Sequence, residues 1–287
     1  VGYVKIGVPT EERHILATLH DATYQFGIDY LRDVWYSTSY LLDRKQSMNG
    51  CAKKRFENYK QQPLEFVFDK SFTGKLSQFG LDPNRRTPSG IKAAIIREKG
   101  TNGEREMAYM LYLAGFDVKD VTMTDLISGR ETLEDINMVV YCGGFSNSDV
   151  LGSAKGWAGS FLFNPKAKAA LDNFYAREDT LSLGVCNGCQ LMMELGLITP
   201  EDKKKGKMLH NDSHKFESNF LGVTVPMNRS VMFGSLSGSK LGIWVAHGEG
   251  KFSLPYPEDH YNVVLKYSYD EYPGNPNGSD YSVAGIA

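Results

Sequence analysis

Cysteine is scarce in this sequence of 287 residues, with four in all: Cys51, Cys142, Cys186 and Cys189. They are too few and too unevenly spaced for a disulfide scaffold, which excludes the small cross-linked secreted domains and favours a reducing, cytoplasmic setting. Long apolar runs are also missing, and the first residues lack the basic-then-apolar pattern of a signal peptide. We therefore predict a chain without a membrane partner.

Neither sign of charge is in excess. The chain has 32 Lys and Arg residues against 34 Asp and Glu, and its longest basic run is the three lysines at 203–205. This balance gives no reason to expect nucleic acid or an anionic membrane as a partner. Internal repeats and low-complexity tracts are absent too. With 41% hydrophobic residues, the chain can bury the core of one large or two modest domains.

The first ninety residues predict little regular structure apart from one helix. Residues 1–8 have a strand-like composition, and a short element is expected to begin at His14. From Tyr30, apolar residues recur at steps of three and four, which predicts an amphipathic helix. Residues 46–88 are polar and irregular, so we interpret them as a linker lying on a surface.

From residue 91 the pattern changes to alternating strands and helices. Strands are predicted at 91–96, 116–123, 136–141 and 180–185, and helices at 104–114 and 165–177. This alternation is typical of a doubly wound α/β domain with a mostly parallel sheet. After Gly196, short strand-like runs at 221–225, 241–246 and 262–267 predict a short antiparallel region.

Cys186 stands at the turn between a predicted strand and a predicted helix. Gly184 and Gly188 lie two residues before and two residues after it. A nucleophile elbow needs small residues at these two positions, because the strand and the helix approach closely there. The N-terminus of the helix also favours a thiolate at this position. The pattern predicts Cys186 as a nucleophile.

Other interpretations of the cysteines remain open. Cys186 and Cys189 form a Cys-x-x-Cys at the start of a helix, as in thiol-disulfide oxidoreductases. The same pair with His210 and His214 has the ligand types of a zinc site, although the gap between the pairs is longer than in a zinc finger. A non-catalytic interaction domain is a further alternative. Cys142 and Cys51 are interpreted as buried apolar residues.

Paired glycines after the strand at 136–141 could supply an oxyanion hole. The stretch 142–146 contains Gly143 and Gly144 and ends a strand at the same sheet edge as Cys186. Each backbone donor there would lower the activation free energy by roughly 3 kcal/mol. The alternative interpretation of these glycines is a simple turn that ends the strand. Gln190 lies one helical turn after Cys186, where its amide could bind a polar substrate. The predicted oxyanion and substrate-binding residues are Gly143, Gly144, Phe145, Asn187 and Gln190.

His247 and Glu249 could complete a catalytic triad, because a thiol nucleophile lacks a base and an orienting carboxylate. In an extended segment both side chains would lie on one face. This arrangement can place both near a site without a hydrogen bond between them.

Five motifs of the sequence resemble those of the glutamine amidotransferase domain of large-type phosphoribosylformylglycinamidine synthases, and they occur in the same order as in that family. The resemblance covers residues 91–287, and residues 1–46 resemble the tail of the synthetase domain of the same family more weakly. The motifs are Cys142-Gly143-Gly144-Phe145-Ser146, Asp149-Val150-Leu151-Gly152, Gly184-Val185-Cys186-Asn187-Gly188-Cys189-Gln190, Ala246-His247-Gly248-Glu249-Gly250 and Asn275-Pro276-Asn277-Gly278-Ser279.

The resemblance implies an activity and a domain division. Cys186 would attack the side-chain amide of glutamine, form a thioester and release ammonia. A synthetase domain would then use the ammonia, with ATP and Mg²⁺, to amidinate formylglycinamide ribonucleotide. The implied domains are a synthetase tail at 1–46, a linker at 47–90 and the amidotransferase at 91–287. The implied partners are glutamine and the remaining synthetase domains, and no cofactor or metal is expected in this chain.

The family's triad histidine and glutamate come from a Pro-His-Pro-Glu stretch that follows the Asn-Pro-Asn-Gly-Ser motif. The sequence ends at Ala287 without such a stretch. The resemblance therefore implies a fragment that is truncated at its C-terminal end, and it does not assign the triad to His247 and Glu249.

Overall fold

A parallel four-stranded sheet forms the centre of the region after residue 90. The structure is a computed structural model, and it describes residues 2–61 and 64–287. The strands lie in the order β4-β3-β5-β6, with every neighbouring pair parallel. Their bounds are β3 Lys92–Arg97, β4 Asp117–Thr122, β5 Met138–Tyr141 and β6 Leu181–Gly184. All four predicted strands are confirmed, with small shifts at their ends.

Helices cover both faces of this sheet, as the doubly wound prediction requires. On one face, α3 packs Leu111 against Ile95 and Val140. On the other face, a larger core surrounds Trp157 and Phe161. Alternate residues of each strand supply the two cores, because successive side chains point to opposite faces of a sheet. The helices are α3 Glu104–Leu113, α4 Met123–Ser128, α5 Lys155–Leu162, α6 Pro165–Tyr175 and α7 Asn187–Leu195.

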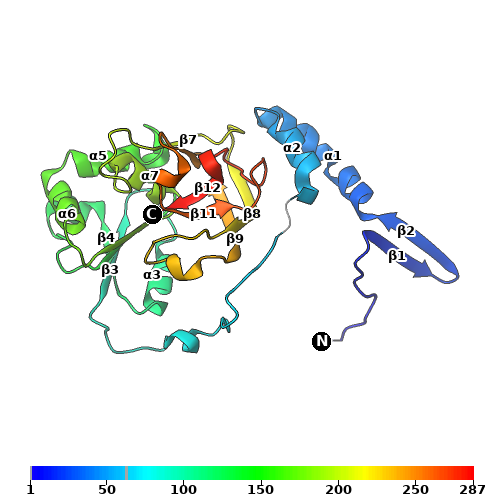
Figure 1. Ribbon diagram of the computed structural model, residues 1–287, viewed down its shortest axis with the longest axis horizontal. Helices are drawn as coiled ribbons and strands as arrows, with labels where there is room; N and C mark the ends of the chain where they lie inside the picture. The colour runs from blue at the N-terminus through cyan, green and yellow to red at the C-terminus, as the bar shows by residue number, and fades with distance from the viewer. Residues whose placement is uncertain (1, 62–63) are drawn as a thin grey trace.

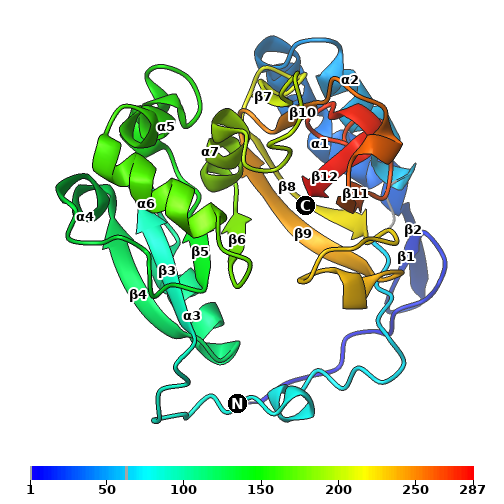
Figure 2. The same ribbon diagram turned by 60° about the vertical axis from the view of Figure 1, so that its left-hand side comes forward.

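The region after α7 forms a second sheet with antiparallel strands in the order β12-β11-β8-β9. Figure 2 shows it beside the parallel sheet, with α7 between the two. The predicted antiparallel region is confirmed, but it has as many strands as the parallel sheet and is not the short element we expected. The strands are β8 Glu217–Thr224, β9 Lys240–His247, β11 Val263–Tyr267 and β12 Val283–Ile286, and a separate pair joins β7 Lys207–Leu209 to β10 Lys251–Ser253.

The N-terminal segment is a hairpin followed by two helices, and Figure 1 shows it projecting from the rest of the chain. The hairpin pairs β1 His14–Leu19 with β2 Ala22–Gly27. The helix predicted from Tyr30 is confirmed as α1 Ile28–Gln46. The prediction of a strand at 1–8 is wrong for residues 2–8, which are exposed and form no strand. Among the described residues, no other strand lies beside them to pair with. Val1 lies outside the described residues.

The predicted linker contains a helix that sequence analysis missed. Helix α2, Cys51–Glu57, buries Cys51 and Ala52, and its Phe56 ring stacks on Tyr40 of α1 with ring centroids 4.7 Å apart. A seven-residue helix has too few turns to show a clear period, so only the packing reveals it. Residues 64–90 are mostly irregular, as expected. The short 3₁₀ turns are Asn58–Gln61, Leu76–Phe79, Ser146–Asp149, Gly234–Leu236, Glu258–His260 and Asp280–Ser282.

Across residues 2–61 and 64–287, none of the helices combines the length and apolar character that a bilayer crossing requires.

Candidate active site

Cys186 lies on a sharp turn between strand β6 and helix α7. Its backbone angles are φ 53° and ψ −111°, which a non-glycine residue rarely adopts. Such strain persists only where the surrounding structure enforces it, and it is typical of functional sites. The strand-to-helix placement predicted from the sequence is confirmed.

The two flanking glycines explain how the strand and the helix fit together. A Cβ on Gly184 would lie 2.6 Å from the carbonyl oxygen of Gly188. A Cβ on Gly188 would collide with the carbonyl oxygen of Tyr141 in the neighbouring strand β5. Any larger residue at either position would therefore push the turn away from the sheet.

The loop after β5 brings backbone donors to Cys186. Gly144 has φ +121°, and a Cβ there would lie 2.6 Å from the Cα of Thr101. The loop is tied to the segment after β3 by hydrogen bonds from Asn102 N to Gly143 O (2.9 Å) and from Phe145 N to Gly100 O (2.8 Å). The backbone N–H groups of Gly144 and Asn187 face the Cys186 sulfur and lower the pKa of its thiol. Two converging backbone N–H groups beside a nucleophile are the donors of an oxyanion hole.

The ionisation of Cys186 differs from the expectation of a favoured thiolate. Burial raises the pKa of the Cys186 thiol above its ordinary value, and the N–H groups of Gly144 and Asn187 lower it only partly. Nearby Asp149 raises it further through its negative charge. The helix N-terminus does act in the predicted direction, but desolvation of the sulfur is the larger effect.

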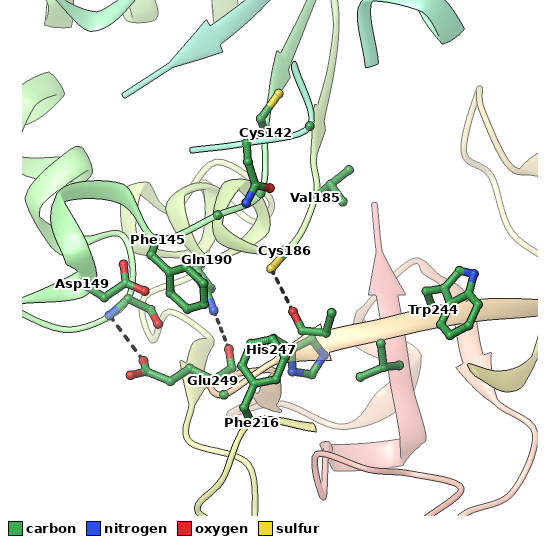
Figure 3. A pocket seen from close by; sticks show the side chains of 18 of the residues that line it. Cys142, Phe145, Asp149, Val185, Cys186, Gln190, Phe216, Trp244, His247 and Glu249 are labelled. Atoms are coloured by element: carbon green, nitrogen blue, oxygen red, sulfur yellow. Dashed lines mark hydrogen bonds between the residues drawn. The ribbon is translucent and has the colours of Figure 1, made fainter. Parts of the chain in front are cut away.

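A cavity of about 750 Å³ opens in front of Cys186, between the two sheets. Figure 3 shows the Cys186 sulfur pointing towards the end of β9, where the thiol donates to the carbonyl oxygen of Ala246 at 3.7 Å. The lining includes aromatic rings, small backbone groups and a few polar side chains. Among its members are Gly143, Gly144, Phe145, Asp149, Cys186, Gln190, His210, Phe216, Trp244, His247 and Glu249.

The other predicted binding residues have different positions around this cavity. The Phe145 ring is about half exposed and lies 6.2 Å from the Phe216 ring, centroid to centroid. Asn187 is fully buried: its side-chain oxygen accepts from Ser146 N (3.1 Å), and its amide donates to Gln190 Oε1 (2.8 Å). Asn187 therefore braces the oxyanion loop, a role that its position in the sequence did not indicate.

Gln190 lines the cavity, but hydrogen bonds within the protein already occupy its amide. Its Nε2 donates to the carbonyl oxygen of Glu249 at 2.7 Å, as Figure 3 shows. Ser146, Asn187, Gln190 and Glu249 thus form one chain of hydrogen bonds that joins three walls of the site.

His247 and Glu249 both line the cavity and do not hydrogen-bond each other. The Glu249 carboxylate accepts from Ser153 N (3.3 Å) and faces His210 Nδ1 at 3.6 Å. Nδ1 of His247 is buried and has no hydrogen-bond partner among the described residues. Burial lowers the pKa of His247 to about 4. His247 is therefore a neutral ring without an orienting carboxylate, unlike the histidine of a triad.

Cys189 does not share the cavity of Cys186. It lines a second cavity of about 380 Å³ together with Leu183 and Ile286, and burial raises its pKa to about 12. An inert buried thiol does not suit a redox pair. Within the described parts of the chain, no three His, Cys, Asp or Glu side chains gather to hold a metal, so the zinc arrangement with His210 and His214 is not assembled.

Sequence analysis missed two aromatic residues of the cavity wall, Phe216 and Trp244. Phe216 and Trp244 carry no local signal, since their approach to Cys186 depends on how the antiparallel sheet packs against the parallel sheet. Asp149, to which the sequence motif alone assigns no role, accepts from Asn187 Nδ2 through its Oδ1 at 3.2 Å.

Comparison with known proteins gives one matching family model. Residues 90–287 match the model of the CobB/CobQ-like glutamine amidotransferase domain. The solved structure of PurLQS from Thermotoga maritima is similar, with a TM-score of 0.52 and 28% identity over 68% of this chain and 81% of that one.

Curated relatives share more sequence over nearly the whole chain. The probable phosphoribosylformylglycinamidine synthase, chloroplastic/mitochondrial, of Arabidopsis thaliana is 39% identical over 90% of this chain and 19% of its own length. Phosphoribosylformylglycinamidine synthases of Drosophila melanogaster and Homo sapiens are 37% and 38% identical over 88% and 89% of this chain, and over 20% and 21% of their own lengths. The chain thus spans about a fifth of the length of these relatives.

Proposed function

The chain belongs to the family of CobB/CobQ-like glutamine amidotransferase domains, and from this premise we propose that residues 91–287 are the glutamine-hydrolysing part of a phosphoribosylformylglycinamidine synthase. The observation that carries the proposal is the strained backbone of Cys186 on the strand-to-helix turn, where the N–H groups of Gly144 and Asn187 lower the pKa of its thiol. This geometry suits acyl transfer from an amide to a thiol.

The proposed reaction begins with attack of Cys186 Sγ on the side-chain carbonyl carbon of glutamine. The carbonyl oxygen becomes negative and is stabilised by the N–H groups of Gly144 and Asn187. The C–N bond then breaks, the thiol proton ends on the leaving nitrogen as ammonia, and a glutamyl thioester remains on Cys186. Water hydrolyses the thioester to glutamate and restores the thiol.

The cavity walls have separate roles in this proposal. Phe145 and Phe216, whose ring centroids lie 6.2 Å apart, supply an aromatic part of the cavity wall. Asn187 and Gln190 hold the oxyanion loop and the 247–250 segment in place through their amides. Gly143 allows close approach, because a Cβ there would lie 3.2 Å from the Cβ of Cys186.

The use of the ammonia is a further part of the proposal. We assign residues 1–46 to the tail of a synthetase domain and residues 47–90 to a linker, supported by relatives of which this chain spans only a fifth. The synthetase would convert formylglycinamide ribonucleotide to the amidine with ATP and Mg²⁺. The described residues contain no group of three His, Cys, Asp or Glu side chains that could hold a metal ion. The ATP and Mg²⁺ of the proposal therefore belong to the synthetase domain. A cytoplasmic location is proposed on the low cysteine content.

Replacement of the nucleophile tests the proposed function. In the full-length enzyme, Cys186→Ala should abolish synthesis with glutamine and leave synthesis with free ammonium, because only the ammonia supply is lost. Cys189→Ser is the matched control and should keep glutamine-dependent synthesis, whereas a thiol-disulfide oxidoreductase would need both cysteines. Glutamine-dependent turnover in Cys186→Ala would show that the nucleophile is wrongly assigned.

A further inference from the structure

Two helices outside the region that matches the family model contact one wall of the catalytic cavity. Helices α1 and α2 lie against residues 212–217, which connect β7 to β8. We propose that Arg55 of α2 is a positioning residue that couples α1 and α2 to the cavity wall carrying Phe216. The expected effect on labelling of Cys186 by a glutamine-like reagent rests on the proposed function. The expected effect on hydrogen exchange of the wall does not.

Arg55 is the centre of a buried cluster of four charges. Its Nη1 donates to Asp43 Oδ2 of α1 at 2.8 Å, and its Nη2 donates to Glu217 Oε2 of β8 at 2.7 Å. Lys215 Nζ donates to the other oxygen of Asp43 at 2.5 Å. The side chains of Arg55, Asp43 and Glu217 are 16%, 8% and 1% exposed. Two positive and two negative groups therefore pair in a largely buried place, with Lys215 the most exposed of them at 24%.

The cluster lowers the pKa of Asp43, and both of its carboxylates are hydrogen-bonded through both oxygens. Burial raises the pKa of Asp43, but hydrogen bonds from Lys215 and Ser47 and the charge of Arg55 lower it more. Glu217 Oε1 accepts from Ser213 Oγ (2.5 Å) and from the hydroxyl of Tyr272 (3.0 Å). A network of this kind holds one geometry, because each broken bond would leave a buried charge without a partner.

Backbone contacts strengthen the same junction. Met48 N donates to Ser213 O at 2.9 Å, and Asn49 Nδ2 donates to Asp212 O at 2.7 Å. The short turn between α1 and α2 therefore holds the segment that follows His210. This segment contacts α1 and α2 as well as its own domain.

The segment also forms the cavity wall. Lys215 and Phe216 line the cavity, and the Phe216 ring lies against Phe145 of the oxyanion loop. Within the same segment, Asn211 donates to His247 O (2.7 Å) and accepts from Gly250 N (3.0 Å). A movement of α1 and α2 that displaces Glu217 or Lys215 would therefore also displace Phe216. Through the hydrogen bonds of Asn211, it would shift the 247–250 segment as well.

The test compares Arg55→Met and Arg55→Lys with a control on the same helix, Lys53→Met, in the chain of residues 1–287. Lys53 forms an exposed i,i+4 pair with Glu57 and does not contact the cavity wall. The first readout is amide hydrogen exchange of residues 210–217, with β3 as the internal reference. The second is alkylation of Cys186 by the glutamine-like chloroketone L-2-amino-4-oxo-5-chloropentanoate, with iodoacetamide as the non-specific electrophile.

For Arg55→Met we expect exchange of residues 210–217 to rise about tenfold, while β3 is unchanged, and the half-saturating chloroketone concentration to rise by a similar factor. Iodoacetamide should react at the wild-type rate, and Arg55→Lys should recover part of both effects. Equal exchange of residues 210–217 in Arg55→Met and Lys53→Met would overturn the inference.

Two further outcomes are decided by the same design. If Arg55→Met fails to fold, Asp43→Asn removes one charge and must still raise exchange of residues 210–217 selectively; no selective change there rejects the coupling. If the chloroketone does not label wild-type Cys186, the proposed function fails, and hydrogen exchange alone decides whether Arg55 positions the wall.

Discussion

The sulfur of Cys186 experiences two opposing influences. Burial among the walls of the cavity raises its pKa, and the N–H groups of Gly144 and Asn187 lower it. The first effect is larger, so the resting group is a thiol, and a neutral thiol attacks amides poorly. The same two N–H groups stabilise the transition state more strongly than the resting state. The carbonyl oxygen of glutamine gains negative charge there, in a place from which most water is excluded.

Gly144 tests the oxyanion role. A Cβ at Gly144 would meet Thr101 Cα at 2.6 Å with the backbone at φ +121°, so Gly144→Ala must turn or displace its N–H group. We expect kcat for glutamine hydrolysis by the full-length enzyme to fall about a hundredfold with little change in KM. Gly80→Ala is the control, because Gly80 also has a positive φ but open space around it. A rise in KM with unchanged kcat would contradict the oxyanion role.

His247 makes a prediction about acid stability. Burial lowers its pKa from 6.5 to about 4, so between these values the unfolded chain binds a proton that the folded chain does not. The contribution of His247 to the free energy of unfolding is therefore complete above pH 6.5 and decreases as the pH falls towards 4. The total decrease is on the order of 3 kcal/mol. In denaturant titrations, His247→Gln should lose less stability than the wild type between pH 7 and pH 4.5. Parallel losses would show that His247 titrates normally.

At the scale of elements, the strand, turn and helix around Cys186 fit together only because glycine lies at two contacts. Gly188 belongs to the first turn of α7 and faces the carbonyl oxygen of Tyr141 in β5. The helix therefore approaches the sheet more closely than any side chain would allow. This closeness is what points the N-terminal N–H of α7 at the sulfur.

Gly188→Ala should separate this helix from the sheet. We expect a loss of about 3 kcal/mol in the free energy of unfolding, the upper end for overpacking, together with slower alkylation of Cys186. The matched control is Gly159→Ala in α5, where a Cβ would meet only the Phe163 ring at 3.7 Å. The control should be neutral or stabilising by up to about 1 kcal/mol, because alanine favours a helix. Thermal denaturation of both variants decides the comparison, and a stable Gly188→Ala would refute the close-contact explanation.

At the scale of the whole molecule, the cavity in front of Cys186 lies where the parallel and antiparallel sheets meet, and none of the described residues places a base against its sulfur. In the described part of the chain, no histidine hydrogen-bonds its sulfur. His260 pairs with Asp202 at 2.8 Å, and His247 is a neutral ring without an orienting carboxylate. A positioned base contributes roughly a hundredfold to ten-thousandfold in rate.

We therefore predict that His247→Ala leaves glutamine hydrolysis by residues 1–287 within about twofold of the wild type, because a neutral ring without an orienting carboxylate does not serve as the base. Glutamate release by the two proteins is the measurement. Robust turnover by residues 1–287 that His247→Ala destroys would contradict this prediction and make His247 the base.

The sequence by itself determined the local features of this protein. Neighbouring residues determine the alternation of strands and helices after residue 91 and the turn at Cys186 with its flanking glycines. These features could therefore be predicted from the sequence alone. The amphipathic helix beginning near Tyr30 was visible for the same reason. Short helices such as α2 and α5 were missed, because a few turns do not establish a period.

Only the tertiary structure decided which distant groups meet. The balance of burial against two N–H donors at Cys186, the placing of Cys189 in a separate cavity and the hydrogen bond from Ser153 N to the Glu249 carboxylate all depend on how distant segments pack. The contact of Arg55 with Glu217 joins residues 162 positions apart. Desolvation and long-range hydrogen bonds arise only when such segments come together, and for this reason no local pattern in the sequence predicts them.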